Sequence, residues 1–345
     1  LIMIDGVRFN SSTFRTGPSQ YLATIDPYIA SMVEIVSGPS SVLFGSGAMG
    51  GVMHIITKQP KKSEHFRADY SLLGHSADGA VGGKLYLSGY QSGLGFIIGG
   101  TYNQFGELRS GGSAIDEYQP LSAYQSDNYH INLSYDFTSD LSLNAMLLHN
   151  RVNDAGRTDR LGQGDVRFYD NRDIFSLLTL KWQPEQVIDK ITATLSYHQQ
   201  YEYATRFNCH KNDNGTVDSM ADCITFDEKF LSRKRQYDDV VHVLGGNIDV
   251  ALELIEQKLF INSGVEYYMD SVESSLKDAK ASNDFLFELQ DRGQLSTGST
   301  YLTSGAYIYG DLKIASWHED STKLMFDGGS RYSYFAATAS DVPSI

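Results

Sequence analysis

The sequence predicts a mostly all-β protein that forms a transmembrane antiparallel β-barrel, and three observations lead to this prediction. Apolar and polar residues alternate with a period of two through most of the chain after residue 60. The alternating runs are about ten residues long, the length that a tilted strand needs to cross a bilayer. Short turns and long polar loops alternate between these runs, as they do in outer-membrane barrels.

The segment 129–137 shows the alternation clearly. Tyr129, Ile131 and Leu133 point to one side of a predicted strand, and the polar residues between them point to the other. Long loops are expected at 105–126, 151–172, 204–236 and 271–300. Eleven strands are predicted, near residues 66–73, 80–90, 94–104, 129–137, 141–150, 174–183, 191–203, 238–252, 258–270, 305–314 and 323–335.

The polar faces of these strands carry charged residues, among them Asp249, Glu266 and Arg331. A charge facing lipid costs about 2–4 kcal/mol at the middle of the bilayer, so these side chains must face a hydrated or filled interior. A soluble β-sandwich also alternates in polarity. Long structureless loops are uncommon in sandwiches, however, and ten-residue strands repeated this often are long for that fold.

Composition narrows the choice of partners. The chain of 345 residues has a formal net charge of −14, which argues against nucleic acid because phosphate binding needs a basic face. No run of 18 apolar residues occurs, so a helical membrane span is excluded. The first residues read as a strand already under way, without a signal peptide, and the last ones stop in turn-like sequence. We therefore expect the chain to be a fragment.

The two cysteines, Cys209 and Cys223, are separated by a polar, turn-rich segment. Structural metal sites usually need four ligands, and only His210 lies nearby. A disulfide closing this loop would stabilise it by about 3 kcal/mol and would indicate an oxidising compartment. Two free thiols are the alternative.

Residues Gly45 to Gly50 spell G-x-G-x-x-G, which in a dinucleotide-binding fold precedes a helix. Here a β-branched, strand-like run follows at 51–58. Because no helix is predicted after the motif, a dinucleotide-binding site is not supported. The glycines suit tight turns and close backbone packing instead.

A longer pattern is more specific. Ile4-Asp5-Gly6-Val7-Arg8, Ile25-Asp26-Pro27, the run from Val33 to Val52 and Ile55-Ile56-Thr57-Lys58 occur in the order and spacing seen in one family. In this respect the chain resembles the C-terminal half of the plug domain of TonB-dependent outer-membrane receptors. The resemblance covers about the first 60 residues. Its motif positions are Asp5, Gly6, Glu34, Gly38, Pro39, Gly45, Gly47, Gly50 and Gly51.

The resemblance implies a domain organisation and a function. Residues 1–60 would be the C-terminal part of a small mixed α/β plug inside the lumen, and 61–345 the first half of the barrel. The protein would be a multi-pass protein of the Gram-negative outer membrane, in contact with its lipids, and not an enzyme. It would import a large scarce nutrient, a ferric siderophore or haem, as transported ligand rather than intrinsic cofactor. A TonB-type protein in the periplasm would supply the energy.

The resemblance also places an apical, ligand-facing plug loop at 10–21. Aromatic rings there would stack on a planar ligand, and an arginine would pair with an anionic chelate. A surface loop with one buried anchoring aromatic is the alternative. The candidate ligand-binding residues of this loop are Ser12, Thr13, Phe14, Arg15 and Tyr21.

Two positions depart from the family pattern. The family usually has an arginine before Gly38-Pro39 that pairs with barrel carboxylates, whereas this chain has Ser37. That difference leaves open how the plug is held to the barrel wall. His54 stands where relatives usually carry asparagine, and we expect it to be a hydrogen-bonded structural residue.

Haem is a candidate ligand because the chain has nine histidines. His75, His149 and His210 lie in predicted loops or near loop-facing strand ends, where an axial ligand is expected. A ferric siderophore needs only aromatic and arginine side chains.

Other classes of protein remain as alternatives. An outer-membrane enzyme is not supported by motif, because G-x-S-x-G is absent and His318-Glu319 lacks the second histidine of H-E-x-x-H. A passive porin or an adhesin would lack the plug-like first 60 residues. A soluble all-β binding protein would not reside in the outer membrane.

Overall fold

The chain forms two β-sheets, described here from a computed structural model. A four-stranded sheet occupies the first 57 residues, and a twelve-stranded sheet occupies the chain from residue 67 to residue 338. The structure describes residues 1–11, 24–38, 41–48, 50–63, 65–111, 118–184, 187–217, 219–290, 293–317 and 322–339.

The small sheet has the strand order β2-β1-β4-β3. β1 (Ile2–Ile4) runs parallel to β4 (Gly51–Thr57), and the other two pairings are antiparallel. β2 (Val7–Arg8) and β3 (Ala30–Ser37) are its edges. Its short helical turns are η1 (Pro27–Ile29), α2 (Ser41–Phe44) and η2 (Ser46–Ala48). This part is therefore mixed α/β, as predicted.

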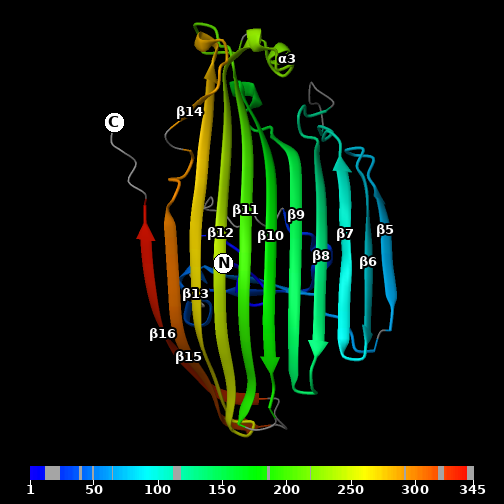
Figure 1. The fold of residues 1–345 in the computed structure, drawn as a ribbon, viewed down its shortest axis with the longest axis vertical. Helices are drawn as coiled ribbons and strands as arrows, with labels where there is room; N and C mark the ends of the chain where they lie inside the picture. The colour runs from blue at the N-terminus through cyan, green and yellow to red at the C-terminus, as the bar shows by residue number, and fades with distance from the viewer. Residues whose placement is uncertain are drawn as a thin grey trace.

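The large sheet, called the wall below, is an antiparallel meander in which successive long strands lie side by side (Figure 1). Short turns join the strands at one end, and longer connections join them at the other, where α3 (Met220–Cys223) lies. We call these the short-turn end and the long-loop end. The strands are β5 (Arg67–Gly74), β6 (Val81–Gln91), β7 (Leu94–Phe105), β8 (Tyr124–Asp136), β9 (Leu141–Arg157), β10 (Asp165–Trp182), β11 (Ile188–Cys209), β12 (Leu231–Ile255), β13 (Leu259–Lys280), β14 (Glu288–Gln290), β15 (Thr300–Trp317) and β16 (Thr322–Thr338).

The connections at the long-loop end also contain η3 (Leu161–Gln163), η4 (Glu228–Phe230) and η5 (Ala281–Asn283). None of the helices in the described ranges has the length and apolar character needed to cross a membrane.

All eleven predicted wall strands are present in chain order, and β14 is an additional short one. The predicted length of about ten residues is wrong for β9 to β13, β15 and β16, which have 17 to 25 residues. On the outer face of β12, apolar side chains end at Val240, and Asp238 and Gln236 follow. The strand continues beyond this apolar band with polar residues on both faces, so the alternation disappears while the backbone pairing does not. The predicted long loops are correspondingly too long.

The small sheet packs against the inner face of the wall. A shared apolar core joins Ile4 and Phe9 to Phe175, Val243 and other wall residues. The outer face instead exposes a belt of apolar side chains that includes Leu195, Leu244, Ile248, Val265 and Met269. Polar residues of the inner face contact the segment that directly follows the small sheet, and they face the filled interior as the sequence predicted. The Asn132 amide donates to the Lys58 carbonyl over 3.1 Å, and the Asn144 amide donates to Gln59 over 3.2 Å.

One motif glycine is required by the geometry of the small sheet. Gly51 has φ +134°, a conformation that L side chains rarely adopt, and an added Cβ would collide with the Val36 carbonyl oxygen on β3. Gly50, its neighbour, has ordinary φ, and an added Cβ would meet nothing within 4 Å.

We predict that Gly51→Ala destabilises the protein by about 1–3 kcal/mol, because it combines backbone strain with a steric clash at the β3–β4 pairing. Gly50→Ala is the matched control and should change stability by less than about 0.5 kcal/mol. Thermal unfolding of the full-length protein measures both. Equal effects of the two substitutions would contradict this role for Gly51.

Candidate functional site

Arginines form a row across the inner face of the wall near the long-loop end. Arg167 pairs in register with Arg157 on β9 and with Arg206 on β11, and Arg206 pairs with Arg235 on β12. Residues directly opposite each other in an antiparallel pair share one face, so the four guanidinium groups converge. We call Arg157, Arg167, Arg206 and Arg235 the arginine row.

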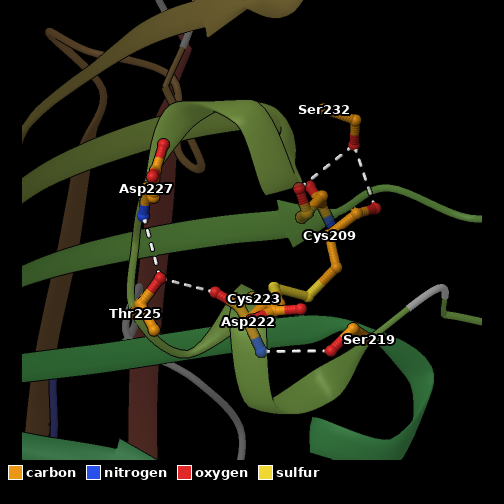
Figure 2. Close-up of a disulfide and its surroundings, with 8 residues drawn as sticks. Cys209, Ser219, Asp222, Cys223, Thr225, Asp227 and Ser232 are labelled. Carbon is orange, nitrogen blue, oxygen red and sulfur yellow. Dashed lines mark hydrogen bonds between the residues drawn. A yellow bond between two sulfur atoms is a disulfide. The ribbon is translucent and has the colours of Figure 1, made fainter.

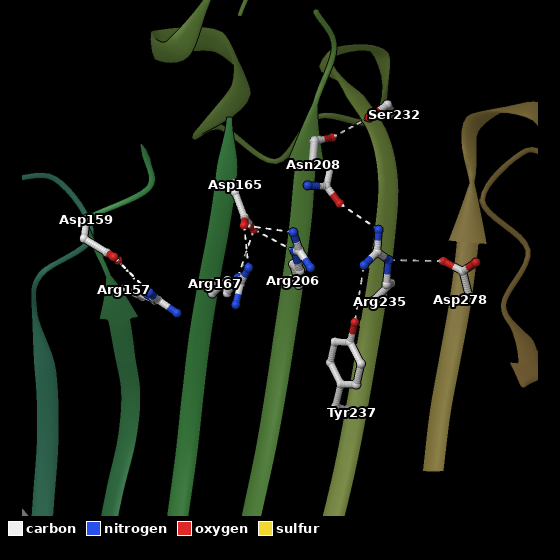
Figure 3. A network of polar contacts seen from close by, with 10 residues as sticks. All are labelled: Arg157, Asp159, Asp165, Arg167, Arg206, Asn208, Ser232, Arg235, Tyr237 and Asp278. Atoms are coloured by element: carbon white, nitrogen blue, oxygen red, sulfur yellow. Dashed lines mark hydrogen bonds and ion pairs between the residues drawn. The ribbon is translucent and has the colours of Figure 1, made fainter. Parts of the chain in front are cut away.

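Aspartates keep the row from being purely repulsive (Figure 3). Asp165 accepts hydrogen bonds from Arg167 over 3.0 and 2.6 Å and from Arg206 over 2.7 and 2.9 Å. Two arginines thus share one carboxylate. Like charges placed opposite each other destabilise a sheet, and an interposed carboxylate removes most of that cost.

A second shared carboxylate lies on β13, directly opposite Arg235 of β12. Asp278 of β13 accepts two hydrogen bonds of 2.6 Å from Arg233 and lies 3.7 Å from Nε of Arg235. Arg157 pairs with Asp159 over 2.6 and 2.9 Å. The arginine row, Arg233 and these three aspartates together form what we call the mouth cluster. It contains two more arginines than aspartates, in a chain whose net charge is −14.

Two aspartates of the mouth cluster, Asp165 and Asp278, have pKa values below the ordinary value of an aspartate. Burial alone would raise the pKa of Asp165, but hydrogen bonds from Arg167 and Arg206 outweigh it and hold that pKa below its ordinary value. The hydrogen bond from Arg233 lowers the pKa of Asp278 in the same way, against a smaller opposing effect of burial. At neutral pH the cluster is therefore a fixed set of charges with a positive excess.

A disulfide-linked loop lies next to the arginine row. Cys209 ends β11, and the disulfide connects it to Cys223 in α3 (Figure 2). The predicted disulfide is confirmed. Both sulfurs are buried in a small apolar core with Val166 and Leu231, against which Phe226 and other loop residues pack. The loop is thus a folded unit rather than a polar tether.

Of the residues that the sequence predicts to bind a ligand, the structure describes the three histidines and not those of the plug loop. Ser12, Thr13, Phe14, Arg15 and Tyr21 lie outside the described residues, as does Pro39. The three histidines are not brought together. His75 follows β5 and its Nδ1 is 3.9 Å from Asp78, while His210 is exposed beside the disulfide loop. His149 lies on the outer face of β9 beside Tyr129, with ring centroids 5.8 Å apart.

Three motif residues of the small sheet, Asp5, Gly6 and Glu34, have contacts with β4. Asp5 accepts hydrogen bonds from the Thr57 amide over 2.8 Å and from its hydroxyl over 2.6 Å. The Gly6 amide donates to Nε2 of His54 over 2.9 Å, and Nδ1 of His54 is 3.4 Å from Glu34. His54 is therefore a hydrogen-bonded residue, as expected. Among the described residues no group of three or more His, Cys, Asp or Glu side chains could hold a metal ion.

Two arginines connect the small sheet to the wall without an arginine at position 37. Arg8 on β2 pairs with Asp270 on β13 over 2.6 Å. On the other flank Arg331 of β16 pairs with Glu266 and reaches the Val42 carbonyl over 3.5 Å. A third contact joins Asp26 to the Tyr86 hydroxyl over 3.0 Å. The small sheet is thus fixed at several strands of the wall.

Sequence reasoning missed the mouth cluster. Arg233 and Arg235 fell within a segment interpreted as loop, and the register that aligns Arg157 with Arg167 is not visible along the chain. The available signal was the repeated charge at alternate positions, Asp165-x-Arg167 and Arg233-x-Arg235.

The chain matches known proteins in both of its parts. A family profile described as the TonB-dependent Receptor Plug Domain matches residues 1–52. The ferric aerobactin receptor of Klebsiella pneumoniae is 38% identical over 117 residues, which cover 31% of this chain and 15% of that protein. The vitamin B12 transporter BtuB of Vibrio vulnificus (strain YJ016) is 25% identical over 233 residues, covering 64% and 32%.

Solved structures share the fold over nearly the whole chain. The copper transporter OprC superposes with a TM-score of 0.74 at 15% identity, covering 98% of this chain and 48% of that one. The siderophore receptor PiuA of Acinetobacter baumannii gives a TM-score of 0.63 at 13% identity, covering 97% and 54%. The first 52 residues therefore match the plug domain of TonB-dependent receptors, and the chain as a whole shares the fold of these solved transporters. It spans about half the length of these solved relatives and less of the curated ones.

The barrel fold gives the chain a definite orientation in the outer membrane. In outer-membrane barrels the short turns face the periplasm and the longer loops face outward. The long-loop end, with the mouth cluster and the disulfide loop, is therefore extracellular. The small sheet is part of the plug, and its contacts with the wall are plug–barrel contacts.

We predict that replacing Cys209 and Cys223 together by serine loosens the extracellular loop 210–230, because the bond closes a loop with a sequence separation of 14. The loss is about 3 kcal/mol in the chain-entropy model. Hydrogen exchange of the loop amides in the full-length receptor measures it. Amides of β6 and β7 serve as the internal control, and unchanged exchange in the loop would refute the prediction.

We further predict that the mouth cluster loosens in acid. A carboxyl with a lowered folded-state pKa contributes stability above its unfolded-state pKa of about 4, and that contribution is lost as pH falls through the folded value. The pKa values of Asp165 and Asp278 are both lowered. Proteolysis of the loops at pH 7 and pH 3 tests this. Asp165→Asn should weaken the pH dependence, and an unaltered profile in that variant would contradict it.

Proposed function

We propose that this receptor imports an anionic metal chelate, a ferric siderophore with carboxylate groups, across the outer membrane by TonB-dependent active transport. The observation that supports this most directly is the positive excess of the mouth cluster on the inner, extracellular side of an acidic protein. Guanidinium groups bind carboxylates in a planar, two-bonded geometry. Two relatives are named as receptors for ferric aerobactin and for rhizobactin.

The remaining parts of the proposal follow from the family. Residues 1–60 are assigned to the plug and 61–345 to the barrel. A periplasmic TonB-type protein supplies the energy, and the protein is not an enzyme. Haem is the weaker alternative, because its three candidate histidines occupy separate places and one of them faces outward.

Arg206 is the most useful residue for a test. Its guanidinium shares Asp165 with Arg167, so after its removal the carboxylate keeps one partner and the local fold persists. Arg151 offers a matched control. It also lies on a wall strand and pairs with one aspartate, Asp127, over 2.8 Å, but on the outer face.

We predict that Arg206→Met lowers the affinity of the full-length receptor for a ferric carboxylate chelate about tenfold to a hundredfold, because a partly desolvated charge contact is lost. Arg151→Met should leave affinity within about twofold. Equilibrium binding at two salt concentrations measures both, and the wild-type affinity should fall as salt rises.

Three results would count against the proposed function. Equal losses in the two arginine variants would remove the mouth cluster from recognition. Tighter binding of haemin or cobalamin than of any ferric chelate would change the ligand. Uptake that continues after the proton gradient is collapsed would indicate a passive pore.

A further inference from the structure

The contact between the β1–β2 hairpin and strands β11 to β13 has a charged clamp at its centre. The guanidinium of Arg8 bonds to Asp270, whose side chain is fully buried, and lies 4.7 Å above the ring of Tyr268. The backbone amide of Arg8 also donates to the Tyr268 hydroxyl over 3.4 Å. A single plug side chain therefore contacts two neighbouring inner-face residues of the same wall strand.

Beside this clamp, at the level of Asp270 on the neighbouring strands, apolar side chains fill the gap between plug and wall. Phe9 is fully buried, and its ring lies 4.5 Å from the His198 ring and 5.4 Å from the Phe175 ring. Val241 and Val243 of β12 belong to the same core. A hydrophilic chelate cannot cross such a region until the hairpin leaves the wall, because its polar groups would lose their hydrogen bonds.

On the periplasmic side of the clamp, the same gap opens into a polar cavity of about 240 Å³. Asp5 and Gly6 at the tip of the hairpin line it on the plug side. Thr192, Asn247, Asp249 and Asn262 are among the wall residues that line it. These side chains carry hydroxyl, amide and carboxylate groups that can form hydrogen bonds with a polar guest.

The hairpin is attached to the rest of the plug in a way that permits local release. Among the described residues β2 pairs with β1 alone, through two residue pairs, Met3 with Arg8 and Ile4 with Val7. Strand β4, in the interior of the sheet, is held on both sides. Among the described residues, moving β2 away from the wall breaks its two residue pairs with β1, the ion pair with Asp270 and the hydrogen bond to Tyr268.

We propose that the ligand passes the plug between the β1–β2 hairpin and strands β11 to β13, with the Arg8–Asp270 pair as the gate of this path. The apolar region around Phe9 seals the path at rest, and the polar cavity receives the chelate once the seal opens. The proposal rests on the transport function proposed above, but it concerns the path and not the identity of the cargo.

The test is the electrical conductance of the full-length receptor in planar bilayers. Arg8→Met and Asp270→Asn should each raise the open fraction by at least about tenfold over wild type, because breaking one partner of a buried ion pair strongly favours separation. Asp26→Asn is the matched control. It alters another buried aspartate that joins plug and wall, at β6 and β7. That variant should stay closed.

A cysteine placed in the cavity locates the path. In the Arg8→Met background, Asn262→Cys followed by a bulky thiol reagent should block most of the conductance. Ser134→Cys, at the periplasmic end of β8, should show no block with the same reagent. The chain's two natural cysteines are joined to each other, so the introduced thiol is the reactive one among the described residues.

Three outcomes would overturn the gate: no conductance in either Arg8→Met or Asp270→Asn, equal conductance in Asp26→Asn, or equal block at both cysteines. The assay needs no ligand. A receptor that binds no ferric chelate would refute the proposed function, while a path opened and blocked as described would still support the gate.

Discussion

The constraint on which this structure depends is that a chain crossing hydrocarbon must pair its backbone hydrogen-bonding groups within the protein. Long antiparallel strands meet this constraint. Their outer face then contacts lipid, and their inner face contacts the lumen. The outer face of the wall carries Leu244, Ile248 and Val265 toward lipid, and the inner face carries polar and charged groups that need partners. The plug supplies many of those partners. The plug is small and rich in turns because it must fit inside the barrel and still provide partners for the polar groups of the inner face.

The same constraint explains why ion pairs are concentrated on the inner face. Charged side chains are excluded from the lipid side, so Glu266, Asp270 and Arg331 face the plug. Above the apolar band the exclusion ends, and charges appear on both faces, as Arg151 and Arg206 show. The extracellular ends of β10 to β13 are stabilised by backbone pairing together with the shared Arg–Asp hydrogen bonds and the small apolar core around the disulfide. The disulfide and its apolar core fix the loop beside them.

The sequence predicted the wall well where one face is apolar. Alternation from Tyr129 to Phe137 identified β8 within a few residues, because lipid on one side imposes the period of two. Alternation does not identify a strand where both faces contact water. Arg233 and Arg235 were therefore assigned to a loop, although they lie in β12. The arginine row depends on the register of four strands, set by turn lengths and by a bulge in β9 near Asp154, and no local pattern encodes it. The Cys209–Cys223 pair could be predicted because its loop is short and local.

The mouth cluster and the Arg8–Asp270 pair use the same chemistry in different surroundings. Side chains of the mouth cluster arginines are 17–37% exposed, so water and salt compete with their aspartates and a carboxylate ligand can exchange with them. Asp270 has no exposed surface, so breaking its bond to Arg8 would weaken the compensation of a buried charge. The exposed mouth cluster therefore suits rapid, reversible binding of a ligand. The buried Arg8–Asp270 pair suits a contact that separates only when force is applied to the plug. Recognition and retention thus occur at different depths of one lumen, with the difference set by desolvation rather than by residue type.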